Sequence, residues 1–129
     1  MPRLKTETLG GGDQSWLGST HGIANARTEI IDISTFTLAT HYPNGYIPSG
    51  LPVAKVGGVL VPYDATEGTT TGAGILAGFV LTDHKVDVPA IDFGVPLYDH
   101  GRVKVASLPI SFTAPAAAAK RAVTTIVFI

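Results

Sequence analysis

Three histidines beside predicted turns are the residues of this chain whose type could do chemistry. His41, His84 and His100 could hold a metal ion or act as a general base, and Asp83 and Asp99 directly precede two of them. Adjacent strand residues point to opposite faces, so an Asp-His pair in a strand cannot orient the imidazole, and turns recruit Asp for backbone hydrogen bonds in any case. Because no His-x-His or HExxH spacing is present, we expect turn histidines and no metal site.

Nucleophilic and phosphate-binding patterns are incomplete as well. No serine lies in the Gly-x-Ser-x-Gly turn that exposes a hydrolase nucleophile, and the chain has no Cys. Residues 68–74 resemble a phosphate loop, but they lack the Lys of that loop and lead into a predicted strand instead of a helix. Asp64 and Glu67 share a polar loop, where a carboxylate pair is usually just hydrated. We therefore predict no enzyme activity and no cofactor.

Composition indicates what fold must position these residues. The 129 residues fit one domain, 45% of them are hydrophobic, and 15 Gly and 9 Pro indicate many turns between short strands. The abundance of Val, Ile and Thr predicts an all-β domain and excludes a helical bundle. A net charge of −1 without any run of like charges argues against nucleic acid as the main partner.

No segment is expected to direct the chain into or across a membrane. The longest apolar stretch, residues 72–81, is too short for a membrane span. Arg3 and Lys5 are not followed by the apolar run of a secretory signal. We therefore expect a protein that is made and used without export.

The elements are predicted from alternation and turn residues. Strands are expected at residues 29–38 (or two strands with a break near 34), 51–56, 59–63, 73–81, 86–88, 90–93, 95–98, 102–106 and 123–129. Gly57-Gly58 predicts a two-residue hairpin, and residues 99–101 predict a second hairpin between the strands that flank them. Gly74 and Gly78 indicate a bend or a close backbone approach. One short helix is expected near the C-terminus, at residues 114–122.

Residues 1–27 differ from the rest and are predicted to be a flexible N-terminal arm ahead of a β domain at 28–129. They sustain no apolar period, so they cannot offset the entropy of ordering. Trp16 and Leu17 are the exception. Trp16 could fold back on the domain, anchor the arm on a partner, or form a stacking platform for a sugar or a base. The arm and the apolar tail at 123–129 both need a partner to cover them, which favours a protein that acts by forming an interface with a partner.

The middle of the chain resembles a known family. Residues 48–53 (PSGLPV) lead into a hairpin that ends in 61–64 (VPYD), and a polar loop then gives way to 72–78 (GAGILAG). This succession resembles the head decoration (capsid-stabilising) proteins of tailed bacteriophages. The resemblance continues through 95–105 and a segment at 112–119, so that it covers residues 27–129.

The resemblance implies a structural virion protein. It implies a small β-clip or β-tulip-like fold that forms a homotrimer and binds the phage major capsid protein at three-fold positions on the outer capsid surface. There it would stabilise the expanded head, on the virion and, during assembly, in the host cytoplasm. The arm would order on the capsid by adding a strand, which makes Trp16 and Leu17 the capsid-contact candidates. This arm is longer and richer in Gly than the shortest in the family, so its path does not carry over.

Two other classes of function stay open. A trimeric dUTPase-like hydrolase would need acidic, Ser/Gly and C-terminal aromatic motifs, which are not found in that arrangement. A carbohydrate-binding or adhesion module of a virion would need clustered exposed aromatic side chains, whereas Tyr42, Tyr46, Tyr63 and Tyr98 are spread among predicted turns.

Overall fold

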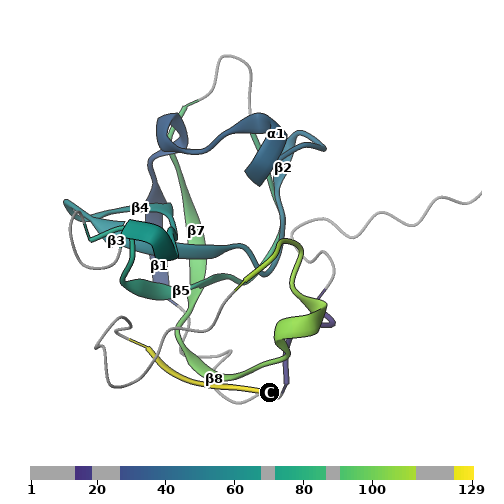
Figure 1. The fold of residues 1–129 in the computed structure, drawn as a ribbon. Helices are drawn as coiled ribbons and strands as arrows, with labels where there is room; N and C mark the ends of the chain where they lie inside the picture. Colours follow the sequence, from purple (N-terminus) through teal and green to yellow (C-terminus); the bar gives the residue numbers. More distant parts are fainter. Residues whose placement is uncertain (1–13, 19–26, 68–71, 87–90, 113–123) are drawn as a thin grey trace, which may run out of the picture.

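Short strands make up most of the computed structural model, which describes residues 14–18, 27–67, 72–86, 91–112 and 124–129 (Figure 1). The strands are β1 Arg27–Ile31, β2 Tyr46–Ile47, β3 Pro52–Val56, β4 Val59–Pro62, β5 Leu76–Val80, β6 His84–Lys85, β7 Phe93–Tyr98, β8 His100–Val103 and β9 Thr125–Phe128. The helical elements described are α1 Leu38–His41 and the 3-10 turns Ile33–Thr35, Ala65–Glu67 and Val105–Ser107. The prediction of an all-β domain is confirmed. The predicted helix at 114–122 lies outside the described residues.

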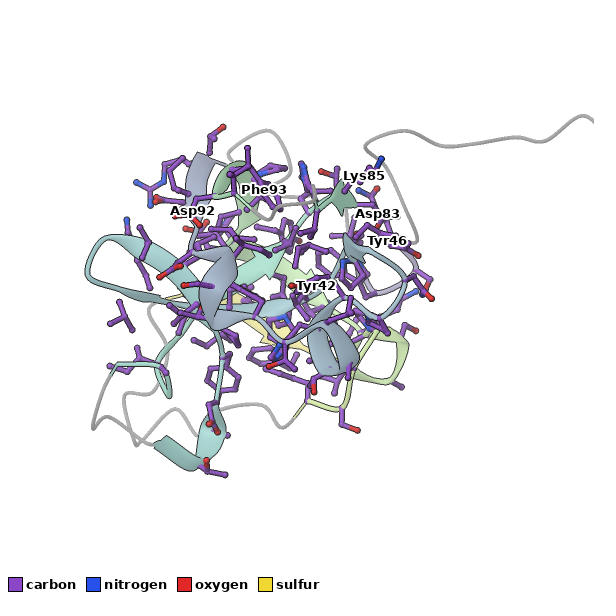
Figure 2. All side chains as sticks on the ribbon, turned by 90° about the horizontal axis from the view of Figure 1, so that it is seen from above. Tyr42, Tyr46, Asp83, Lys85, Asp92 and Phe93 are labelled. Atoms are coloured by element: carbon purple, nitrogen blue, oxygen red, sulfur yellow. The ribbon has the colours of Figure 1, made fainter. Side chains whose placement is uncertain are left out.

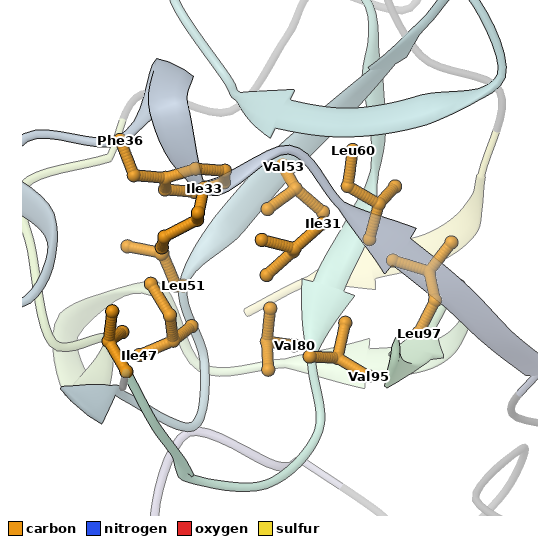
Figure 3. Packing of buried hydrophobic residues seen from close by; sticks show 11 residues of the cluster. Ile31, Ile33, Phe36, Ile47, Leu51, Val53, Leu60, Val80, Val95 and Leu97 are labelled. Atoms are coloured by element: carbon orange, nitrogen blue, oxygen red, sulfur yellow. The ribbon is translucent and has the colours of Figure 1, made fainter. Parts of the chain in front are cut away.

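Five strands close into a small barrel in the order β1-β4-β3-β5-β7. All neighbours run antiparallel except β1 and β4, which meet in parallel at Ile31 and Leu60. Apolar side chains from every barrel strand fill the interior, and Figure 3 shows them converging. They are Ile31, Val53, Leu60, Val80, Val95 and Leu97. This core stabilises the domain, because each fully buried aliphatic side chain contributes about 1.5–3 kcal/mol.

The β3–β4 hairpin forms where Gly57 and Gly58 predict it. Both residues have positive φ, 62° and 85°, which is the requirement of the tight two-residue turn that matches strand twist. The register pairs Val56 with Val59 directly across the turn. The predicted hairpin is confirmed.

The bend predicted at Gly78 is also confirmed. The register between β3 and β5 shifts at this point, and Gly78 has a φ of 152°. A Cβ at Gly78 would lie 2.6 Å from the backbone oxygen of Tyr98 on β7. The barrel wall can therefore close here only around a glycine.

The predicted strand at 29–38 and the break near Ser34 are right only in part. β1 ends at Ile31, and Ile33–Thr35 form a 3-10 turn instead of a second strand. The Asp32 carboxylate accepts hydrogen bonds from the backbone N–H of Ser34 (3.3 Å) and from its hydroxyl (2.6 Å). This local side-chain cap competes with strand geometry, and it ends the strand.

The second predicted hairpin is wrong. Residues 93–98 form one continuous strand, β7, whose two edges are occupied by β1 and β5. No edge of β7 is left for the following strand, so β8 pairs elsewhere, in parallel with β9 from the C-terminal tail. The predicted tail strand at 123–129 is found as β9, Thr125–Phe128.

Candidate interaction surface

Trp16 is the centre of a second apolar cluster, beside the barrel. It is 0% exposed and packs with Leu76, Phe79, Tyr98 and Val103. Its ring lies 5.8 Å from that of Phe79 and meets that of Tyr98 edge-on at 5.5 Å, the geometry that aromatic quadrupoles favour. The alternative in which Trp16 folds back on its own domain is therefore the one that the structure shows.

Ser49 completes this site with a buried hydrogen-bond chain. The indole Nε1–H of Trp16 donates to Ser49 Oγ at 3.0 Å, and the Ser49 hydroxyl donates to the Leu81 carbonyl at 2.7 Å. The Asp83 carboxylate accepts the Ser49 N–H at 2.6 Å and so fixes the turn. A Cβ at Gly50 would lie 2.8 Å from the indole, so glycine is required beside it. We call the pocket formed by Ser49, Gly50, Phe79, Tyr98 and Val103 the Trp16 slot.

The backbone around Trp16 joins the edge of β8. Leu17 forms an antiparallel bridge with Val103, Lys104 N–H donates to Trp16 O at 2.6 Å, and Gly18 N–H donates to Arg102 O at 2.9 Å. The prediction of a flexible arm over all of 1–27 is therefore wrong for residues 14–18, because burial of an indole and two backbone bonds offset their ordering entropy. We call residues 14–18 the latch segment. Leu17 itself is half-buried, and residues 1–13 and 19–26 lie outside the described residues.

The opposite edge of the same sheet carries apolar side chains and is not paired with another described strand. β9 pairs with β8 over Thr125–Phe128, and its Ile126 and Phe128 pack on the Trp16 cluster. Val127 and Ile129, which alternate with them, are each 54% exposed. Within the described part of the chain no other strand pairs with β9. We call the outer side of β9, with Val127 and the following Ile129, the β9 edge; the Ile129 side chain also reaches the latch segment, since a Cβ at Gly18 would lie 2.9 Å from its Cδ1.

Two of the three histidines considered for chemistry, His41 and His84, make local structural contacts. His41 ends α1, where its Nδ1 accepts the N–H of Thr37 at 2.8 Å and its ring meets Phe36 edge-on. Burial lowers the pKa of His41 below its ordinary 6.5, so the ring is neutral at pH 7 and suited to accept this bond. Its ring is therefore already committed to the α1 turn.

His84 and His100 lie in separate short strands, β6 and β8. His84 Nε2 lies 2.7 Å from the Thr82 hydroxyl, and its ring is tilted by 32° against that of Phe93, with the centroids 5.9 Å apart. Burial lowers the pKa of His84, and the charge of Asp83 opposes this shift in part. Among the described residues no three side chains of His, Asp or Glu gather as metal ligands.

A cavity of about 330 Å³ lies beside α1 and brings two of these candidates to one place. His41, Tyr46, Ser49, Asp83 and Ser107 are among its lining residues. The Asp83 carboxylate already holds the Ser49 N–H, and His41 Nδ1 already accepts from Thr37. These two lining groups thus hold local backbone in place, which is a usual role of polar side chains beside turns.

The tyrosines do not form an exposed aromatic platform. Tyr98 is buried, and Tyr42, Tyr46 and Tyr63 are half-buried. Figure 2 shows Tyr46 near Asp83 and Lys85, in keeping with the pairing of Tyr46 and Lys85 between β2 and β6. A sugar-stacking surface needs open aromatic faces, so this arrangement does not favour the adhesion alternative.

Comparisons with known proteins add no relative. No protein-family model matches the chain, and neither curated proteins nor solved structures give a match. The helices in the described part of the chain are all too short to cross a membrane.

Sequence reasoning found one part of this surface and missed the other. It predicted the apolar strand at 123–129 and that a partner must cover the apolar side chains of this strand, because alternation along a terminal strand is a local signal. It did not find the Trp16 slot, since Ser49 and Gly50 lie 33 or more residues from Trp16. The available signal was the Ser-Gly pair after Pro48, which the sequence analysis uses only for the family resemblance.

Proposed function

We propose that this chain is a structural virion protein that binds as a trimer to the outer surface of a phage capsid at three-fold positions and stabilises the expanded head. The observation that carries the proposal is the β9 edge, an apolar strand edge beside a rigid barrel. An edge strand offers a row of backbone donors and acceptors to an extended partner segment. Val127 and Ile129 add apolar contact to those bonds.

The resemblance to head decoration proteins gives the proposal its second support. The similar segments are neighbours in the barrel, because β3 and β4 form the hairpin after residues 48–50 and β5 pairs with β3. Two glycines of those segments, Gly50 and Gly78, lie where a Cβ would clash. These two glycines are thus residues that this backbone needs, which supports a resemblance that rests on glycines and prolines.

A capsid also suits a contact of this size. A four-residue edge supplies only a few hydrogen bonds, so a single contact is weak. A trimer that engages a shell through three such edges gains avidity from the effective concentration of the second and third contacts. Cylindrical or spherical shells present the same site in many copies, so that weak single contacts suffice.

Cosedimentation with undecorated, expanded phage heads tests this function. We expect saturable binding of the full chain and a loss of at least tenfold in affinity for Val127→Lys, because the charge would be placed in an apolar contact. Leu38→Lys is the matched control, since Leu38 is 57% exposed on α1, away from β9, and should bind unchanged.

The arm is tested with a deletion chosen from the structure. Removing residues 1–13 leaves the latch segment in place, whereas removing 1–27 would take Trp16 out of the core. If the chain that lacks residues 1–13 binds the heads more weakly, the deleted part of the arm contributes to binding the shell. Absence of binding to any expanded head by the full chain would contradict the proposed function.

A further inference from the structure

The latch segment is held by contacts with residues that do not belong to the linker between this segment and the barrel. Its contacts are the indole in the Trp16 slot, the Gln14 side-chain amide on the Leu81 carbonyl (2.8 Å), and the backbone bonds to Arg102 and Lys104. All of these partners belong to residues 49–104. A latch segment from another copy would make the same contacts.

The linker between the latch segment and β1 is longer than its own docking needs. One end of the linker, Gly18, bonds to Arg102, and the other end, Arg27, pairs with Leu97. The distance that the linker must span is therefore limited by the length of the stretch from Leu97 to Arg102. Five residue steps cover at most about 17 Å, and the bond from Arg102 N–H to the Tyr98 hydroxyl draws this stretch tighter. The nine steps from Gly18 to Arg27 reach about 30 Å.

The described surface offers little else to hold copies of the chain together. Its large exposed apolar side chains are Ile30, Leu38, Ile91, Val127 and Ile129. They lie on separate elements apart from the pair on the β9 edge, which the proposed function gives to the shell. A stable interface buries about 800 Å² per partner, so a trimer needs a further large contact.

We propose that in the trimer the Trp16 slot of each copy is filled by the latch segment of a neighbouring copy. The inference rests on the trimer of the proposed function, and it names the element that joins the copies. Exchange keeps every latch contact and changes only which chain supplies it, so it costs little and makes each slot incomplete without its neighbour. A fully buried Trp at each junction is the kind of residue that dominates interface energies.

Disulfide trapping tests the exchange directly, because the chain has no Cys of its own. Leu17 and Val103 face each other as a non-hydrogen-bonded antiparallel pair, whose Cα separation of about 4.5 Å suits a disulfide. We expect the oxidised Leu17→Cys/Val103→Cys variant to run as covalent dimers and trimers on a non-reducing gel, and as a monomer after reduction.

Controls separate exchange from chance crosslinking. Each single variant should stay monomeric, and Val56→Cys/Val59→Cys, across one hairpin, should give only an intrachain bond. A Leu17→Cys/Val103→Cys chain that loses both thiols yet remains a monomer would overturn the proposal. The readout needs no phage heads, so it is independent of whether the chain binds a capsid.

Complementation decides the question if no disulfide forms. Trp16→Ala removes the only Trp and leaves an open slot, whereas Gly50→Ala places a Cβ where the indole lies and closes its slot to the indole of any copy. Mixing the two variants should shift the Trp emission to shorter wavelength as the indole of one copy enters the slot of the other. An unchanged emission from two folded variants would overturn the exchange.

Discussion

Ser49→Ala is the substitution that most directly tests the account of the Trp16 slot. Ser49 is 3% exposed and accepts the indole N–H of Trp16 at 3.0 Å. Alanine would leave this N–H buried without its acceptor, at a cost of about 1–3 kcal/mol. The Leu81 carbonyl also loses the hydrogen bond from the Ser49 hydroxyl, but it keeps the one from the Gln14 side-chain amide at 2.8 Å. The substitution therefore leaves no second buried polar group without a partner. We therefore expect a loss of about 2 kcal/mol in the free energy of unfolding.

Urea unfolding measures this loss with two probes. The fluorescence of the only Trp reports the slot, and circular dichroism reports the strands. A loss of about 2 kcal/mol lowers the urea midpoint by roughly 1 M for a domain of this size. Ser34→Ala is the matched control, because Ser34 is exposed and its hydroxyl bonds only to Asp32, so its loss should stay within about 0.5 kcal/mol.

A double-mutant cycle isolates the bond itself. Trp16→Phe removes the N–H and retains an aromatic ring, so Ser49→Ala should cost less in that background than in the parent chain. We expect a coupling of about 1 kcal/mol between the two positions, measured by circular dichroism. A loss below about 0.5 kcal/mol for Ser49→Ala in the parent, or additive effects of the two substitutions, would refute the reasoning.

Two further outcomes test the barrel and the buried histidines. Gly78→Ala should destabilise the fold by more than about 3 kcal/mol, since its Cβ would lie 2.6 Å from the Tyr98 oxygen at a φ of 152°. Gly57→Ala, with no atom within 4 Å of its Cβ and a φ of 62°, should cost only about 1 kcal/mol in the same urea titration. The folded-state pKa values of His41 and His84 lie below the ordinary 6.5, so the unfolded chain binds protons first and stability falls as the pH drops below about 6.5. Urea midpoints at pH 7.5 and 5.5 should show this fall, and His41→Gln/His84→Asn should reduce it; an equal pH dependence in parent and variant would contradict the assignment.

The elements predicted from the sequence were those whose signals are local. Gly57-Gly58 sets its own turn, and the alternation at 123–129 marks a strand whatever it pairs with. The interpretation of 99–101 as a hairpin turn failed because pairing depends on which edges are free. Since β1 and β5 already occupy both edges of β7, the turn residues could not decide the partner of β8.

The environment of Trp16 could not be predicted for a related reason. The segment around it has no apolar period, and its stability comes from a few contacts with residues far along the chain, notably Ser49 and Tyr98. Composition alone predicts a flexible arm for such a segment, because the segment itself contains few apolar residues. Composition does not show that one of its side chains is fully buried against residues far along the chain. One buried indole with a satisfied N–H is enough to reverse that inference for residues 14–18.

The topology itself restricts where a partner strand can be added. A closed barrel has no free edges, so the five barrel strands offer none. The β2–β6 pair is two residues long and carries the exposed Lys85, a charge of the kind that discourages edge pairing. In the β8–β9 sheet the latch segment occupies the β8 side, and the β9 side carries Val127 and Ile129. On the two proposals, one sheet has two edges with separate uses, the β8 edge for joining copies of the chain and the β9 edge for the shell. Blocking one should leave the other intact, so Val127→Lys should weaken head binding at least tenfold and still give the Leu17–Val103 interchain crosslink when combined with the two cysteines.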